Sequence, residues 1–154
     1  MSKRLWMLVC AVGVLWAAQA FAQAENAPLP DRAAFAVRVV EATRAATPKM
    51  DPRLGDLERE LRVFQKDYNS FVLVRDQTLI LPVGGRGSLR LPDGAEFAIQ
   101  LLGFTPGKVL RARHVVEMPR MKMTRAVAPG GRTLDVLPGQ DRMTIVSTTV
   151  QRAP

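Results

Sequence analysis

The second half of the chain alternates short apolar runs with turn residues, a pattern typical of antiparallel strands. From residue 71 to residue 150 the runs are FVLV, TLILPV, SLRL, EFAIQLL, KVLRARHVV, KMTRAV, RTLDVL and MTIVSTTV. The turn residues between them are Asp76-Gln77, Gly84-Gly85-Arg86-Gly87, Pro92-Asp93-Gly94, Pro106-Gly107, Pro129-Gly130-Gly131 and Pro138-Gly139. Proline fixes one backbone angle and glycine permits a positive one, so both residue types favour turns.

Within this ladder we expect two short strands, 71–73 and 78–80, to pair around a turn at Asp76-Gln77. The glycine-rich segment 84–87 and the segment 105–108 are expected to be hairpin connections. The last strand, 143–150, alternates apolar and hydroxyl side chains along its length.

Two further elements precede the ladder. Residues 33–43 carry Phe35, Val37 and Val39 at a period of two, which predicts a strand, and Val40 on the other parity indicates that both its faces are partly covered. Residues 51–65 predict an amphipathic helix that begins with Asp51-Pro52, a capping residue followed by a proline that needs no N–H partner. The residues that share its apolar face are Leu54, Leu57, Leu61 and Phe64.

Strands before and after a single helix, without regular alternation, predict an α+β fold that is mainly β. We expect an antiparallel sandwich or half-open barrel, with the helix inserted after the first strand and packed on its own sheet. The first strand could pair with the last one. The domain organisation is then a signal peptide at 1–24, a flexible leader at 25–32, one β-rich domain at 33–151 and a tail at 152–154.

The N-terminus has the layout of a secretory signal peptide. Lys3 and Arg4 precede an apolar run from Leu5 to Ala18, which is short for a membrane span. Small residues follow, with three possible cleavage patterns at Ala18-Gln19-Ala20, Ala20-Phe21-Ala22 and Ala22-Gln23-Ala24. We expect a periplasmic or secreted protein; an uncleaved segment acting as a membrane anchor is the alternative.

The single cysteine does not indicate a lipoprotein. Cys10 follows Val9 instead of a small residue, and only a few apolar residues separate it from the charges. Its removal with the signal leaves no thiol for a disulfide, so the core has to be sufficient alone. Removal of Lys3 and Arg4 leaves 20 Lys and Arg against 14 Asp and Glu, a net charge of +6. This charge favours acidic partners in the envelope, and the compartment argues against nucleic acid.

A concentration of basic residues between 108 and 125 is the candidate binding site. It contains Lys108, Arg111, Arg113, Arg120, Lys122 and Arg125, with Glu117 as the only acid. Alternation places Arg111 and Arg113 on one face of a strand, with Lys122 on the neighbouring strand. Such a stripe could hold an anionic polymer or an acidic partner; basic side chains also protect exposed sheet edges from unwanted pairing.

The sequence offers little material for a metal centre, and no cofactor is expected. His114 is the only histidine, and a structural or surface role is the interpretation we favour. Met118, Met121 and Met123 could provide soft thioether ligands for Cu(I). Methionines also fill irregular gaps in cores, and Arg120 and Lys122 lie between these three.

Catalytic patterns are also missing from the sequence, so we do not expect an enzyme. A single histidine gives one candidate base, and no serine lies in a strand–elbow–helix pattern. The glycines of 84–87 lack the spacing to a lysine, and the following helix, that a phosphate-binding loop requires.

Several positions together resemble a family of small exported β-rich envelope proteins of gliding and predatory Gram-negative bacteria. The resemblance runs from about Val37 to Val150. The positions that carry it are Asp51-Pro52-Arg53-Leu54, Leu57, Leu61, Phe64, Tyr68, Ser70-Phe71 and Leu91-Pro92-Asp93-Gly94. They are turns and apolar positions, so the resemblance implies export and a β-rich fold and transfers no catalytic residue.

From these observations we expect a non-enzymatic exported binding protein. The first hypothesis is an accessory subunit of an envelope assembly, of the secretion or motility type, that contacts a protein partner through basic strands or an unpaired edge. The second is a module that binds an anionic envelope polymer through Arg111, Arg113 and Lys122. The third is a copper-binding protein that uses the methionines.

Overall fold

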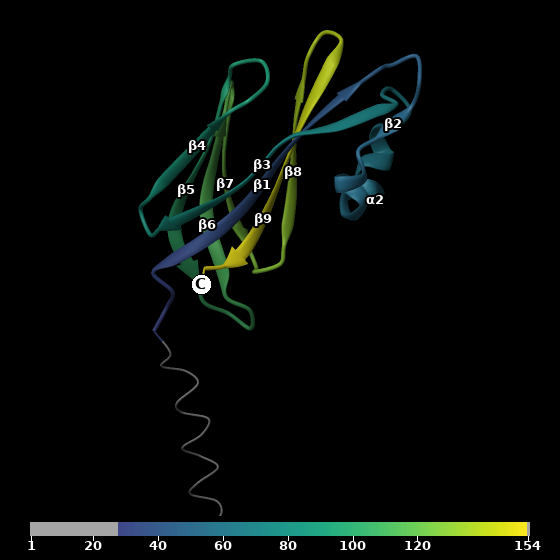
Figure 1. Cartoon of the computed structure of the whole chain (residues 1–154). Coiled ribbons are helices and arrows are strands. Elements are labelled where there is room, and N and C mark those ends of the chain that lie inside the picture. The colour runs from purple at the N-terminus through teal and green to yellow at the C-terminus, as the bar shows by residue number, and fades with distance from the viewer. Residues whose placement is uncertain (1–27, 154) are drawn as a thin grey trace, which may run out of the picture. The chain divides into compact units, whose positions relative to one another are not determined.

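The computed structural model describes residues 28–153, which contain a β-sandwich (Figure 1). One sheet has five strands in the order β2-β3-β1-β9-β8, and the other has four in the order β4-β5-β6-β7. The strands are β1 (Arg32–Thr43), β2 (Lys49–Met50), β3 (Ser70–Pro82), β4 (Arg86–Arg90), β5 (Glu96–Thr105), β6 (Arg111–Met118), β7 (Met121–Val127), β8 (Arg132–Pro138) and β9 (Arg142–Arg152). All pairings are antiparallel except that of β2 with β3. The predicted fold class is confirmed.

Strand β1 lies at the centre of the five-stranded sheet, between β3 and β9. The predicted pairing of the first strand with the last is therefore confirmed, with Ala33 opposite Arg152 and Thr43 opposite Arg142. Side chains on the two faces of a strand alternate, so β1 contributes to two separate cores. This explains why apolar residues of both parities occur in it.

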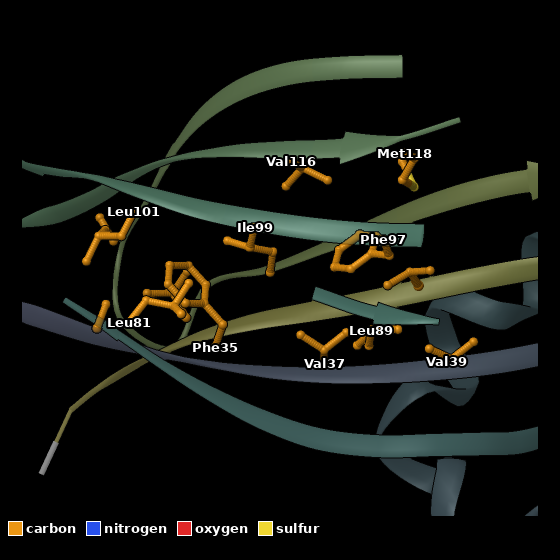
Figure 2. Packing of buried hydrophobic residues seen from close by; sticks show 14 of the residues in the cluster. Phe35, Val37, Val39, Leu81, Leu89, Phe97, Ile99, Leu101, Val116 and Met118 are labelled. Atoms are coloured by element: carbon orange, nitrogen blue, oxygen red, sulfur yellow. The ribbon is translucent and has the colours of Figure 1, made fainter. Parts of the chain in front are cut away.

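The larger core fills the space between the two sheets. Phe35, Val37 and Val39 of β1 face Phe97, Ile99, Leu101 and Val116 of the four-stranded sheet, and all of them are almost fully buried (Figure 2). The smaller core lies on the opposite face of β1, where Val40 and Ala42 contact the helical segment and β3. Burial of this apolar surface is the main stabilising contribution to the fold.

The helical segment is one continuous succession of turns of two kinds. It consists of η1 (Pro52–Leu57), α2 (Glu58–Leu61) and η2 (Arg62–Phe64), of which η1 and η2 are 3₁₀ turns. Leu54, Leu57 and Leu61 are fully buried in the smaller core, which confirms that the apolar face packs on its own sheet. Within residues 28–153, no helix has the length and apolar character of a membrane span.

Asp51 connects this segment to the sheet. Its carboxylate accepts hydrogen bonds from the backbone N–H of Arg53 at 3.0 Å and of Leu73 at 3.2 Å, and from the Arg53 guanidinium at 2.7 Å. The first bond confirms Asp51 as the capping residue, with Pro52 at the first position. The Arg53 guanidinium and these N–H donors hold the pKa of Asp51 well below its usual range.

A group of ion pairs holds the same segment against the outer face of the five-stranded sheet. Asp56 of η1 pairs with Arg38 of β1 at 2.5 Å and with Arg132 of β8 at 2.6 Å, and Arg132 also reaches Glu60 at 3.2 Å. The hydrogen-bonded Arg38 guanidinium lowers the pKa of Asp56 to about 2. Because the Asp56 side chain is half exposed, solvent screens much of this attraction.

Two predicted turns are wrong. Asp76 and Gln77 lie inside the continuous strand β3, whose pairing with β1 shifts only at Val39/Val40. Asp76 is opposite Arg38, so opposite charges support the pairing there. The segment 84–87 is not a hairpin connection, because β3 and β4 belong to different sheets. It is a corner, which the Gly84 N–H fixes by donating to the Leu101 carbonyl at 2.7 Å.

Other boundaries agree with the sequence. The turns at 92–94, 105–108 and 138–139 connect antiparallel neighbours, as expected. The first strand begins at Arg32 and the last ends at Arg152, close to the predicted limits of the β-rich domain. The predicted signal peptide at 1–24 lies outside the described residues.

Candidate binding surfaces

The outer face of the four-stranded sheet carries three of the six predicted binding residues. Arg111 and Arg113 of β6 are exposed there, as alternation predicts, and Lys122 extends from the same face of β7. Lys122 lies opposite Glu117, whereas Arg113 lies opposite Ala126. The positive charge is therefore concentrated at Arg111 and Arg113, four to six residues along β6 from the Lys122–Glu117 pair.

Further charges near Lys122 reduce the basic character of that end. Arg86 of β4 lies 3.2 Å from Glu117 and 4.0 Å from Glu96. These exposed pairs are individually weak, but they mix the two signs of charge across β4, β5 and β6. Lys108, the fourth predicted residue, is exposed in the connection between β5 and β6.

Arg125 does not belong to this face, which corrects its assignment to the basic stripe. On β7 it has the parity opposite to Lys122, and its side chain, only 17% exposed, points between the sheets. There it forms a two-pronged ion pair with Asp135 of β8, with one N–O distance of 2.8 Å. Asp135 is 2% exposed, so the pair is nearly dry and joins the edge strands of the two sheets. The positive charge of Arg125 is therefore neutralised by Asp135 inside the protein.

The three methionines considered for copper also point inward. Met118 is buried opposite Met121, and Met123 is partly buried opposite Val116. The Arg125 guanidinium donates to the Met123 sulfur at 2.9 Å and 3.2 Å. The Met123 sulfur is therefore already hydrogen-bonded to the Arg125 guanidinium. Met118 packs in the larger core, as gap-filling methionines do.

His114, the only histidine, is a buried structural residue, and the sequence favoured a structural or surface role for it. His114 is fully buried and contacts Phe35 edge-on, with ring centroids 5.0 Å apart. Its Nδ1 atom is 3.2 Å from the Ala112 carbonyl oxygen. Burial lowers the pKa of His114, and the charge of Arg125 acts in the same direction, while the Ala112 carbonyl and Asp135 oppose the shift.

Arg120, the sixth predicted residue, lies in the two-residue turn between β6 and β7. Within residues 28–153 it is the only residue other than glycine with a positive φ, at 64°. Its side chain lines a cleft at one end of the sandwich, with a volume of ≈ 790 Å³. In the sequence, Arg120 stood out only for its charge. The Pro119-Arg120 pair between Met118 and Met121 was the signal for this turn.

The long strand β3 presents a largely unpaired edge. Strand β2 pairs with it only at Ser70 and Phe71, so β3 has no strand neighbour on that side from Val72 onward in the described structure. Val72, Val74 and Ile80 of β3 are 36%, 49% and 52% exposed. Between Val74 and Ile80 the edge is polar, from Arg75 to Thr78. An unpaired edge of this length can accept an additional strand.

One known protein is similar to part of this chain. Heat shock protein beta-7 of Rattus norvegicus is 32% identical to this chain over 68 residues, which are 42% of this chain and 72% of that protein. Over that segment, the chain belongs to the heat shock protein family. More than half of this chain lies outside the match to the heat shock protein. No protein-family model and no solved structure matches the chain.

Proposed function

We propose that this chain is an exported, non-enzymatic binding protein that serves as an accessory subunit of a cell-envelope assembly of the secretion or motility type. The proposal combines two lines of support. The N-terminal sequence has the features of a secretory signal, and the described domain offers exposed surfaces for contact. Its only histidine is sealed inside the sandwich, where it reaches no substrate.

The observation that carries this proposal is the open edge of β3. An exposed strand edge with apolar side chains is prone to uncontrolled pairing unless a partner or another element covers it. Val72, Val74 and Ile80 supply those side chains along β3. On that side Leu73 is already bonded to Asp51 and Arg53. Beyond it, a partner that adds an extended segment would satisfy the free backbone groups of β3 and contact exposed apolar side chains along it.

Site-specific crosslinking in intact cells of the source organism tests this function. A photo-crosslinking residue at position 78, an exposed site on β3, should capture one envelope protein reproducibly. The double variant Val74→Lys/Ile80→Lys should remove this product and keep the melting temperature, because both side chains are about half exposed. Val63→Lys and Val109→Lys are matched controls, since they change exposed apolar residues elsewhere.

Crosslinking that is unchanged in Val74→Lys/Ile80→Lys would refute the edge as the contact. Export is checked separately by cell fractionation and intact mass. The expected product is a periplasmic or secreted species whose first residue is Phe21, Gln23 or Glu25, according to which of the three cleavage patterns is used. A cytoplasmic full-length chain would refute the exported role itself.

A second candidate function is the binding of an anionic envelope polymer. The specific observation in its favour is that Arg111 and Arg113 project from one exposed face without a facing acid on β7. Polymer binding would weaken steeply as salt increases, whereas a packed protein interface would persist. The Arg111→Glu/Arg113→Glu variant should then lose retention on an anionic polysaccharide column, and Arg59→Glu/Lys66→Glu should keep it.

A further inference from the structure

The end of the sandwich carries a cleft that the basic stripe and the β3 edge do not include. Three connections surround it, namely those between β4 and β5, between β6 and β7, and between β8 and β9. Its volume is ≈ 790 Å³. The lining is mostly apolar and proline-rich, with Pro92, Ala95, Pro119, Met121, Val136, Leu137 and Pro138 among its residues. The cleft is thus formed by both sheets.

The backbone at Arg120 indicates that its side chain is required at this cleft. A φ of 64° costs an ordinary residue about 1 kcal/mol or more and costs glycine almost nothing. In a two-residue turn whose first residue is proline and whose second has a positive φ, glycine is the usual second residue. Strain of this kind is frequent at functional sites. A long guanidinium placed here, at the rim of a cleft, is most simply explained by a ligand.

The charges around the cleft favour an anion. Two arginines, Arg120 and Arg142, line it, together with one acid, Asp93. Asp93 is engaged in its own turn, where its carboxylate accepts from the Ala95 N–H at 3.0 Å. Arg142 lies 3.2 Å from Glu41, and its side chain remains 58% exposed. For Arg120, no ion pair or hydrogen bond joins its side chain to another residue of 28–153.

We propose that the cleft binds an extended acidic peptide segment of a protein partner, with apolar side chains on the Met121 and Leu137 surface and a carboxylate on Arg120. This inference rests on the proposed role as a binding subunit and specifies a second contact besides the β3 edge. A peptide uses both features of the cleft, because carboxylates match the guanidinium fork and apolar side chains match the lining. An anionic polysaccharide would use the charges alone.

The test uses the purified mature protein and the peptide acetyl-Leu-Glu-Leu-Glu-Leu-Glu-amide, with binding followed by NMR chemical shifts. The amides of Arg120, Met121, Leu137 and Gly139 should shift. The affinity of the Arg120→Gly variant should fall at least tenfold while its melting temperature rises, because glycine relieves the positive φ. Arg59→Ala, a control on the exposed side of the helical segment, should bind within twofold of the wild type.

Two further peptides and one variant separate the contributions of charge and of apolar contacts to peptide binding. Replacement of the glutamates by glutamine, or of the leucines by serine, should each weaken binding, since the proposal requires both charges and apolar groups. Arg120→Lys keeps the charge and should retain an intermediate affinity. Binding of the serine–glutamate peptide as strong as that of the original would indicate a site for anionic polymers and overturn the peptide proposal.

Undetectable binding, equal affinity of Arg120→Gly and the wild type, or shifts confined to β3 or to Arg111 and Arg113 would also overturn it. These results leave the proposed function untouched if the crosslink at position 78 still captures its partner. Loss of that crosslink or of export refutes the proposed function, whatever the peptide does. The two failures are therefore distinguishable.

Discussion

At the scale of single residues, the Arg125–Asp135 pair has the largest expected effect on stability. Both side chains are mostly buried, and they connect β7 of one sheet with β8 of the other. A buried pair gains little over well-packed apolar residues, but loss of one partner leaves an uncompensated charge in a dry environment. The stability of the sandwich therefore requires that both charges are present or that both are absent.

Replacement of Asp135 tests this condition. Asp135→Asn should lower the free energy of unfolding by about 3 kcal/mol, because the Arg125 guanidinium remains between the sheets without its counter-ion. Urea unfolding followed by circular dichroism measures the change. The double variant Arg125→Met/Asp135→Leu should recover most of the loss, and the exposed Asp141→Asn is the control. A loss for Asp135→Asn no larger than for Asp141→Asn would contradict the buried character of the pair.

His114 makes stability depend on pH. Its pKa in the folded protein is lower than in the unfolded chain, where it is about 6.5, because burial disfavours the imidazolium. The unfolded chain therefore takes up a proton first, and stability falls as the pH decreases below about 6.5. The charged groups that influence the ring are Arg125, which strengthens this effect, and Asp135, which opposes it.

The variant His114→Phe isolates this contribution. It keeps an aromatic ring against Phe35 and removes the titrating nitrogen. We expect the wild type to lose stability between pH 6.5 and 5 and the variant to lose less over the same interval, as measured by urea unfolding at each pH. His114→Leu is a second variant in case the larger ring is strained. Identical pH profiles for the wild type and both variants would show that His114 does not titrate in this range.

At the scale of elements, Asp51 is the residue on which the attachment of the helical segment depends. One carboxylate caps η1 and also accepts the Leu73 N–H of β3, next to the place where the pairing of β3 with β1 shifts. The shift skips Val74 in the register, and Asp51 supplies an acceptor for the neighbouring residue. The Asp51 side chain thus caps η1 and also stabilises the register shift in β3.

Removal of this carboxylate should affect both elements. We expect Asp51→Ala to lower the free energy of unfolding by about 2 to 3 kcal/mol, the sum of a lost cap and an unsatisfied buried N–H group. Asp51→Asn should retain part of the cap, and the exposed Asp67→Ala is the control. Hydrogen exchange of the Leu73 amide gives a direct measurement, since this amide should exchange faster in Asp51→Ala. Unchanged protection at Leu73 would refute the proposed link.

The elements also show what the sequence could predict. Period-two alternation predicted β1, β5, β6 and β9, and the cap and apolar spacing predicted the helical segment from 52 to 64. The turn predicted at Asp76-Gln77 was wrong because an edge strand tolerates polar residues. Arg38 also lies opposite Asp76. Whether a glycine-rich turn closes a hairpin or a corner between sheets depends on tertiary packing, and local sequence carries no signal for it.

The prediction that Arg125 belongs to the basic stripe was wrong for a related reason. Nearness in sequence grouped it with Lys122, whereas strand parity places the two on opposite faces of β7. The alternation was visible in the sequence, but the inward face could be assigned only once Asp135, ten residues later, was known to lie across the sandwich. The cleft around Arg120 was not predictable, because it is formed by three connections that are distant in sequence.

At the scale of the whole domain, β9 completes both cores. Val146 and Val150 face the other sheet, and Met143 and Ile145 face the helical segment. We expect a chain that ends at residue 141 to lack cooperative unfolding, because β1 loses one neighbour and both cores are opened. A thermal melt followed by circular dichroism measures this. A chain that ends at residue 152 is the control and should melt like the full-length protein; a cooperative melt of the shorter chain at the same temperature would contradict the role of β9.

The central position of β1 has a consequence for the order of events during synthesis. A chain emerges N-terminus first, so β1 leaves the ribosome well before β9, the strand that lies along one of its sides. Local contacts cannot substitute for this long-range closure, which slows folding. The sheet around β1 therefore remains incomplete, and accessible to holding factors, until β9 is free.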